Sequence, residues 1–201
     1  MYNSAGQVTS VTNALDEETT FIYTDGFLTE IHRPLGSETL IDYDDALRPW
    51  HITNDDGDVL TFEYDGLDRL RILTHPDATT SEWDYERLDL VQSRDRLGHA
   101  VDRTYDDLGR LQTLTDHPDA TTSRTMTFDW CRCGNKLHQM TDPLGHVTTW
   151  NRDIQGRVTE KVLDDTTATT FTYETATSRL SSILDARGQE THFTYDLADS
   201  L

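Results

Sequence analysis

The string with the most unusual chemistry in this sequence is Cys131-Arg132-Cys133-Gly134. Its two sulfurs could form a redox-labile pair, or could bind a metal ion if His117 and His138 completed the ligand set. A zinc site needs about four ligands, usually with a C-x₂-C or wider spacing, whereas C-x-C puts both cysteines on one strand face. A structural turn is therefore favoured, with the redox pair and the metal site as alternatives.

The acidic residues and the histidines offer no better site. Asn54-Asp55-Asp56-Gly57-Asp58 looks like the start of a calcium loop, but it lacks a glutamate at the twelfth position, so a hairpin turn is favoured. The eight histidines stand in no nucleophile or H-E-x-x-H motif, and the many carboxylates single out no catalytic pair. We predict no catalytic residue, no metal, no cofactor and no enzyme activity.

Composition narrows the possible partners. The 201 residues include 17 Lys+Arg and 37 Asp+Glu, a net charge of −20 that argues against nucleic acid or an anionic membrane surface. No apolar run approaches the roughly 18 residues that span a bilayer, and Met1-Tyr2-Asn3-Ser4 does not begin a signal peptide. A hydrophobic content of 35% with 9% aromatic residues indicates a folded protein with a thin core.

Aromatic residues recur about every 21 residues along the whole chain. The successive gaps between these anchors are 21, 20, 21, 21, 20, 25, 20, 23 and 22. A fixed period of this kind is the signature of a repeat architecture. The anchors are Tyr2, Tyr23, Tyr43, Tyr64, Tyr85, Tyr105, Trp130, Trp150, Tyr173 and Tyr195.

Each period contains two turn signals, one just after the anchor and one about ten residues before the next anchor. Glycine, asparagine and aspartate tolerate positive φ, and proline presets a turn φ, so these clusters favour tight reversals. The turn glycines are Gly6, Gly26, Gly57, Gly98, Gly109, Gly145 and Gly188.

Six to eight residues remain between turns, which is a strand length rather than a helix length. A second bulky residue stands two positions before most anchors, as in Phe21 and Phe62, so both share one strand face; Arg103 and Thr148 are exceptions. Apolar pairs after the anchor turn, such as Leu28 and Ile31, are spaced i,i+3. We interpret that spacing as a β-bulge or strong coiling that brings both residues to one face.

One repeat is thus one antiparallel hairpin, and ten anchors predict about twenty strands. At ~4.8 Å per strand the ribbon would be on the order of 95 Å wide, and a twisted sheet of that width curls. We predict an all-β fold: tandem hairpins of about 21 residues in a coiled meander ribbon, part of a large β-shell or barrel wall. Residues 1–201 would be one repeat region of nine to ten repeats without an internal boundary.

The strings Tyr64-Asp65-Gly66-Leu67-Asp68-Arg69-Leu70 and Tyr105-Asp106-Asp107-Leu108-Gly109-Arg110-Leu111 resemble the motif of the YD-repeat, or Rhs, family. Nine or ten copies in phase extend this resemblance from Tyr2 to Leu201. In bacterial Rhs and insecticidal toxin-complex proteins such hairpins form a hollow shell around a toxic C-terminal region, and teneurins carry a related barrel outside animal cells. The shell's core segment and variable toxin are not recognisable here, so the chain is expected to be a fragment of the repeat region.

The resemblance implies a structural shell segment that isolates a toxin or other polypeptide cargo in a secreted or cell-surface parent protein. Its partners would be that cargo and neighbouring repeats of the parent chain. The alternative is a module that binds carbohydrate or a cell surface through its aromatic residues. The position of the anchors separates the two: Tyr23, Tyr64 and Tyr105 packed between strands would support a wall, whereas an exposed row could stack on sugars.

Overall fold

The computed structural model describes residues 1–131 and 134–196, and this part of the chain is all-β, as predicted. It contains eighteen strands and one short 3₁₀ helix, η1 (Pro34–Gly36). The strand count falls short of twenty at the first and last anchors. Tyr2 forms only an isolated bridge with Val8, and the residues described around Tyr195 are not assigned to a strand. The described residues include no helix with the length and apolar character needed to span a membrane.

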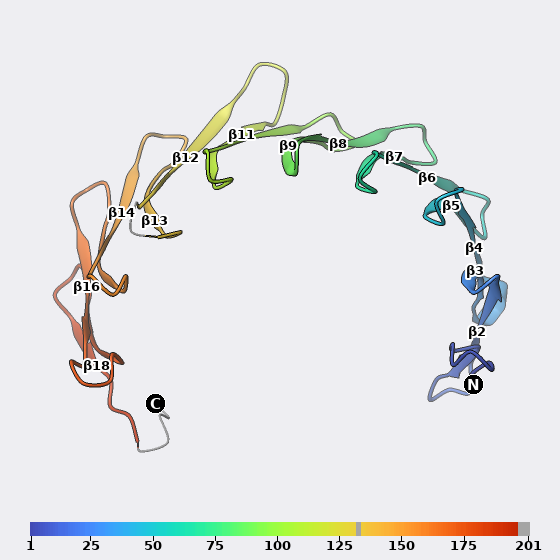
Figure 1. Ribbon diagram of the computed structural model, residues 1–201, viewed down its shortest axis with the longest axis horizontal. Helices are drawn as coiled ribbons and strands as arrows, with labels where there is room; N and C mark the ends of the chain where they lie inside the picture. The colour runs from blue at the N-terminus through green and yellow to red at the C-terminus, as the bar shows by residue number, and fades with distance from the viewer. Residues whose placement is uncertain (132–133, 197–201) are drawn as a thin grey trace. The chain divides into compact units, whose positions relative to one another are not determined.

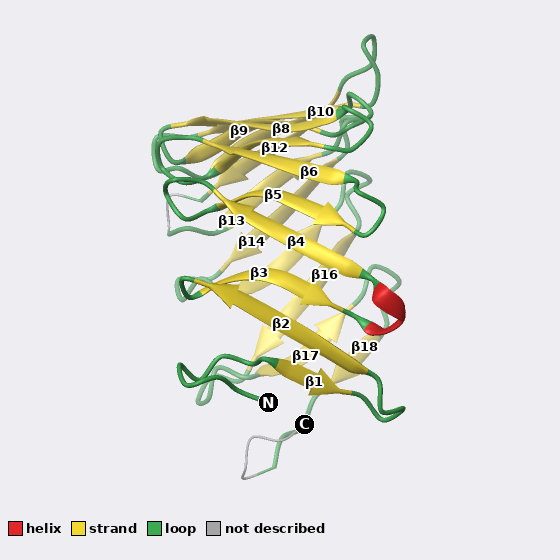
Figure 2. Cartoon of the chain, turned by 90° about the vertical axis from the view of Figure 1, so that its right-hand side faces the viewer, coloured by secondary structure: helices red, strands yellow, loops and turns green. Residues whose placement is uncertain are grey.

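The chain divides into two compact units, Met1–Ala100 and Val101–Leu201, with the division at the first residue of a strand. The single repeat region expected over residues 1–201 remains a prediction. In the first unit, consecutive strands pair antiparallel in chain order (Figures 1 and 2). These strands are β1 (Ser10–Thr12), β2 (Glu18–Thr24), β3 (Phe27–His32), β4 (Glu38–Tyr43), β5 (Pro49–Asn54), β6 (Val59–Tyr64), β7 (Leu70–Thr74), β8 (Thr80–Glu86) and β9 (Asp89–Arg94).

The second unit repeats the same meander. From β11 to β18, each strand pairs antiparallel with the next. Thr104 of β10 contacts Thr113 of β11 through their hydroxyls, 2.6 Å apart. The strands are β10 (Ala100–Tyr105), β11 (Leu111–His117), β12 (Arg124–Trp130), β13 (Leu137–Thr141), β14 (Val147–Arg152), β15 (Val158–Val162), β16 (Ala168–Tyr173), β17 (Leu180–Leu184) and β18 (Glu190–His192).

A β-bulge follows the anchor turn in seven hairpins, which confirms the interpretation of the i,i+3 apolar pairs. In the β2–β3 pair, Tyr23 lies opposite Leu28 and Ile22 lies opposite Glu30, so Thr29 is the extra residue. Leu28 and Ile31 consequently share the face of Tyr23 and Phe21. The same register shift occurs in the β4–β5, β6–β7, β8–β9, β12–β13, β14–β15 and β16–β17 pairs.

The sheets have almost no closed core. Among the described residues, Ala100 is the sole hydrophobic residue that is buried, and no side chain is fully enclosed. Most strand side chains are instead half-buried or exposed, and in β3 and β15 they are half-buried along both faces. Most domains bury a sheet face against a second layer. Here the stabilising contacts must run along the sheet, from hairpin to hairpin.

The turns depend on positive φ at fixed positions. All seven expected turn glycines have positive φ, as do Gly36, Gly134 and Gly156. In the anchor turns, the N–H of one residue donates to the carbonyl three positions earlier, as Gly109 does to Asp106 at 2.9 Å. Leu47 and Asp68 occupy the same position with φ of 64° and 62°, a conformation that costs a residue with a Cβ about 1–2 kcal/mol.

We therefore expect Gly109→Ala to lower the free energy of unfolding by about 1 kcal/mol, because alanine would have to adopt the same left-handed backbone. A methyl group at Gly109 would meet no atom within 4 Å, so the loss reports backbone strain alone. The matched control is Gly66→Ala, in the same kind of turn and equally open, at a glycine that lacks positive φ. Urea denaturation of both variants checks this; equal losses would contradict it.

Candidate functional site

The described residues form no catalytic cluster. The feature that recurs in this part of the chain is the contact between each anchor and the hairpin before it. We call this contact a ladder step. It consists of the anchor side chain, a backbone carbonyl 15 residues earlier (19 residues earlier for Trp130), and the turn residue just before that carbonyl. The carbonyl and the turn residue belong to the preceding hairpin, so each step joins two successive repeats.

The anchor side chain donates a hydrogen bond in most steps. The Tyr64 hydroxyl donates to the carbonyl of Pro49 at 2.7 Å, and Tyr173 donates to Val158 at 2.8 Å. Tyr23, Tyr43 and Tyr195 make the same bond to Val8, Leu28 and Leu180 at 3.0, 2.8 and 2.8 Å. Trp130 keeps the contact through its indole Nε1, which donates to Leu111 at 2.7 Å.

An aspartate directly after the anchor organises the turn from which the next step is built. Asp65 Oδ1 accepts the backbone N–H groups of Leu67 and Arg69, at 2.8 and 3.1 Å. Its Oδ2 accepts two bonds from the Arg69 guanidinium, 2.8 Å from Nε and 2.7 Å from Nη2. Two donors of one guanidinium on a single carboxylate oxygen restrain the orientation of the arginine side chain. The same clamp joins Asp44 to Arg48, Asp106 to Arg110 and Asp153 to Arg157.

The clamped arginine lies over the aromatic ring of the next anchor. Arg69 Cζ is 4.1 Å from the ring centroid of Tyr85, and Arg48 Cζ is 4.6 Å from that of Tyr64. Arg110, Arg157 and Arg179 cover Trp130, Tyr173 and Tyr195 at 5.7, 4.5 and 4.7 Å. A cation over an aromatic face within about 6 Å is attracted by the ring quadrupole. Ring, guanidinium and carboxylate thus alternate along one face of the sheet.

The electrostatics of these groups follow from the clamp. Hydrogen bonds from the arginine side chain are the main cause that holds the pKa of Asp44, Asp65 and Asp106 below its ordinary value. Desolvation raises the pKa of the Tyr43 and Tyr64 phenols. These three carboxylates therefore stay ionised, and the Tyr43 and Tyr64 phenols stay neutral, at pH 7.

In one repeat, the structure places a different residue at the anchor position than the spacing indicates. Arg152, not Trp150, lies at the bulge opposite Val158, as Tyr173 lies opposite Leu180. Arg152 also makes the step bond: its Nη2 donates to the Leu137 carbonyl at 3.1 Å. Trp150 instead occupies the place two positions before the anchor, where a second bulky residue is expected. Thr148 is therefore no longer an exception to that pattern. A search for aromatic residues alone therefore misses an anchor that is an arginine.

The other expected anchors vary in how they take part. Tyr2 is 73% exposed, whereas Tyr85 and Tyr105 are half-buried. In the step to Tyr43, Phe27 replaces the arginine, with ring centroids 5.2 Å apart. The first turn uses neutral groups: Asn3 caps it, and Gln7 donates to the Gly26 carbonyl at 2.9 Å. Sequence reasoning named Trp150 in place of Arg152 as an anchor, and it did not identify the arginine and aspartate partners of the anchors, although the recurring Asp-x-x-x-Arg spacing carried that signal.

The residues considered for metal chemistry lie apart from the ladder. His117 Nε2 is 2.8 Å from Asp102 Oδ2, and His138 Nδ1 is 3.4 Å from the Trp150 carbonyl oxygen. Arg132 and Cys133 lie outside the described residues, so the three interpretations of that string remain predictions. Asn54 caps a hairpin turn, since its Oδ1 accepts the N–H groups of Asp56 and Asp58 at 3.1 and 2.8 Å.

The turns about ten residues before each anchor lie on the rim of the sheet opposite the anchor turns, which we call the opposite rim. Two of these turns are also linked to one another. Asp77 accepts hydrogen bonds from both the hydroxyl and the N–H of Thr79, and it pairs with Arg96 in a turn 19 residues later. The Thr79 hydroxyl bond is the largest cause that lowers the pKa of Asp77 to about 2. Contacts between successive turns therefore reinforce the sheet at both rims.

Comparison with known proteins agrees with this architecture. The RHS Repeat family model matches residues 2–38, and no curated protein matches the chain. The solved structure of TcdB2-TccC3 without its hypervariable C-terminal region aligns with a TM-score of 0.66 at 13% identity, covering 89% of this chain and 12% of that chain. The Photorhabdus luminescens Tc holotoxin pore gives 0.63 at 13% identity, covering 91% and 12%. The TcdB2-TccC3-TEV structure gives 0.56 at 14%, covering 98% and 15%.

These findings confirm the resemblance to RHS-repeat proteins that the sequence indicates. The family model accounts for the first repeats, and the solved structures share the β fold over most of the chain. At these identities the structural likeness establishes the fold alone. The chain spans only 12–15% of the length of the solved chains described here.

The anchor phenol can be tested alone. Tyr64→Phe keeps the ring under Arg48 but removes the 2.7 Å bond to Pro49, so we expect a loss of about 1 kcal/mol in the free energy of unfolding. Tyr85→Phe is the matched control, because the Tyr85 ring lies under Arg69 while its hydroxyl has no hydrogen bond among the described residues. Calorimetry should show a lower melting temperature for the first variant only. A similar change in both would show that the bond is not stabilising.

We expect the turn that contains Asp77 to be sensitive to acid. The lowered pKa of Asp77 means that its ionised form stabilises the fold above the unfolded pKa near 3.8, and that this contribution is lost as the pH falls toward about 2. Thr79→Val removes the hydroxyl donor and should raise the pKa of Asp77, moving that loss to higher pH. Thr79→Ser keeps the donor and is the control. Carboxyl-detected NMR titration gives the pKa directly; an unchanged value in Thr79→Val would refute the assignment.

Proposed function

We propose that the chain is a structural wall segment of an RHS-type shell that encloses and isolates a polypeptide cargo in a secreted parent protein. Its partners in this proposal are that cargo and the neighbouring repeats of a longer chain. It assigns no catalytic residue and no cofactor. The observation that carries the proposal is the ladder step, which joins successive hairpins by a recurring set of contacts.

The ladder step suits an extended wall because it is local. Each step uses residues from two successive hairpins only, as in the contact of Arg48 and Pro49 with Tyr64. A repeat that contacts only its neighbours can be added many times without a new core. A sheet stabilised in this way can grow to the length that an enclosure needs.

The anchors also bear on the carbohydrate alternative. Tyr23, Tyr64 and Tyr105 are half-buried rather than exposed as an open row. An arginine lies over the rings of Tyr64, Tyr85 and Tyr173, where a sugar would have to stack. This arrangement supports the wall over a carbohydrate platform.

The family resemblance supplies the cargo part of the proposal. Enclosure of a toxic C-terminal region is what the resemblance to bacterial Rhs proteins implies. The solved structures that share the fold include a Tc holotoxin pore, a toxin assembly by its description. A net charge of −20 would also favour a soluble surface on such a large wall.

The test compares a parent protein that contains these repeats and the enclosed segment with its Tyr64→Ala variant. Removing this anchor deletes both the stacked ring and the hydrogen bond, so the wall should open locally. We expect limited proteolysis to cut the enclosed segment faster in the variant, while the activity of the released segment stays the same.

The control is Asp55→Ala, at an exposed turn position outside the ladder. It should leave the enclosed segment protected. Equal protection in the parent and in Tyr64→Ala, or an activity lost through a single turn residue, would overturn the enclosure proposal.

A further inference from the structure

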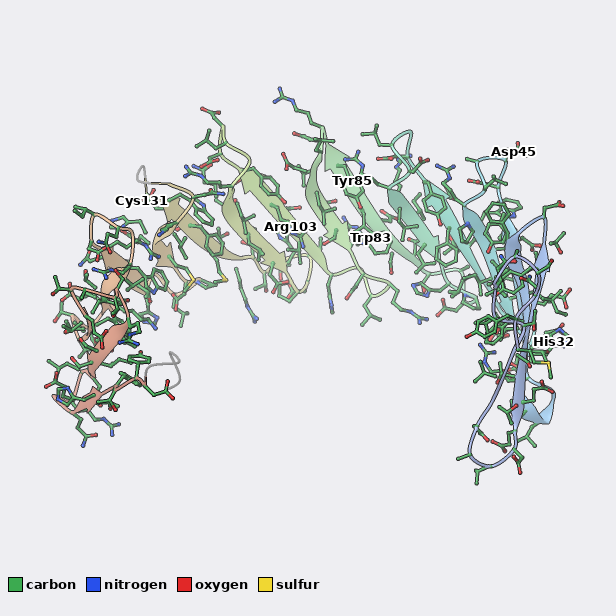
Figure 3. The ribbon with its side chains drawn as sticks, turned by 60° about the horizontal axis from the view of Figure 1, so that its bottom comes forward. His32, Asp45, Trp83, Tyr85, Arg103 and Cys131 are labelled. Atoms are coloured by element: carbon green, nitrogen blue, oxygen red, sulfur yellow. The ribbon has the colours of Figure 1, made fainter. Side chains whose placement is uncertain are left out.

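Three potential metal ligands meet on β3 and β4, on the face opposite the ladder. His32 Nε2 is 2.8 Å from Glu30 Oε2 and 3.2 Å from Glu38 Oε1, and the three donor atoms lie within 4.8 Å of one another. His32 is labelled in Figure 3. Because Ile31 shares the ladder face, its neighbours Glu30 and His32 point to the other face.

Strand register holds this group together. Glu30 and His32 are two residues apart on β3, so their side chains leave the same face of the sheet. His32 lies directly opposite Glu38 in the β3–β4 pair. Directly opposed residues have Cβ atoms about 4.5–5.5 Å apart. The backbone thus fixes all three side chains before any ligand arrives.

The charge around these residues is uncompensated. Neither Glu30 nor Glu38 forms an ion pair with a lysine or arginine of the described chain; both contact only His32. The turn carboxylates Asp44, Asp65 and Asp106 each have a clamped arginine instead. Two carboxylates that converge without a basic partner attract a cation.

The donor set selects the class of cation. Calcium and magnesium prefer ligand shells made only of oxygen, whereas zinc and related divalent metals accept imidazole together with carboxylate. With metal–ligand distances near 2.1 Å, tetrahedral ligand atoms lie roughly 3.4 Å apart. The 3.2 Å separation of His32 Nε2 from Glu38 Oε1 is close to that value, whereas the 2.8 Å separation from Glu30 Oε2 is a hydrogen-bond distance that would lengthen when the ion binds.

We propose that Glu30, His32 and Glu38 form a binding site for a divalent transition metal ion of the zinc class. The side chains are 36–45% exposed, so the ion can enter from solvent and water can complete its coordination. By joining β3 to β4, the metal stabilises this hairpin on the face that the ladder does not use. The proposal is independent of the enclosed cargo.

The experiment titrates the full chain with zinc chloride by isothermal titration calorimetry. We expect His32→Gln and Glu38→Gln each to lose one equivalent of bound zinc, or at least about tenfold in affinity at that site. The matched control is His146→Gln. His146 also contacts a carboxylate, with its Nδ1 2.9 Å from Asp142 Oδ2, but among the described residues this is the one carboxylate at ion-pair distance from it, so its removal should leave the zinc stoichiometry unchanged.

A second measurement avoids substitution altogether. Zinc added to the ¹⁵N-labelled chain should shift the Nε2 resonance of His32 and leave those of His146 in place. Excess magnesium should not reverse the shift. Unchanged zinc binding in His32→Gln, an equal loss in His146→Gln, or an unmoved His32 resonance would overturn the site.

Discussion

The contact of two guanidinium N–H groups with one oxygen of a turn aspartate is the interaction on which the rest of this structure depends. A sheet without a covering layer has little apolar area to bury, so each hairpin must be held by the one before it. A free arginine would sample many rotamers at an entropic cost. Asp65 removes that freedom from Arg69, which then presents a flat cation to the next aromatic ring.

The ladder tolerates different chemistry at a constant geometry. Phe27 contacts Tyr43 where other steps use a guanidinium, and Gln7 with Asn3 forms a neutral version at the first turn. At Arg152 the anchor itself is a cation, and the residue that corresponds to the clamped arginine is Lys136. Lys136 does not stack there; its Nζ donates to the Gly156 carbonyl at 2.7 Å. Lys136 and Arg152 would repel each other if they stacked. In this step each cation donates to a backbone carbonyl instead.

The repeat, its turns and the bulge were predictable because each depends on short-range patterns such as Tyr-Asp and Leu28 with Ile31. The partner of an anchor was not. Tyr64 reaches Pro49 from the neighbouring strand of the β5–β6 pair, and sequence spacing alone does not show which carbonyl a side chain meets across strands. Trp150 was assigned as an anchor because aromatic character served as the sole criterion, and Arg152 does not meet it. The Glu30, His32 and Glu38 group was missed because strand alternation joined to cross-strand pairing produces no linear motif.

The bulge also explains how one ribbon can keep two different faces. Without the extra residue at Thr29, the residues after the turn would alternate in phase with the strand before it, and Leu28 and Ile31 could not both share the face of Tyr23. The bulge thus concentrates the aromatic rings, the arginines and the aliphatic pairs on one side. The other side, with Ile22, Glu30, His32 and Leu40, is left outside the ladder. A cluster such as the Glu30, His32 and Glu38 group can therefore occupy that side without disturbing the contacts that hold successive hairpins together.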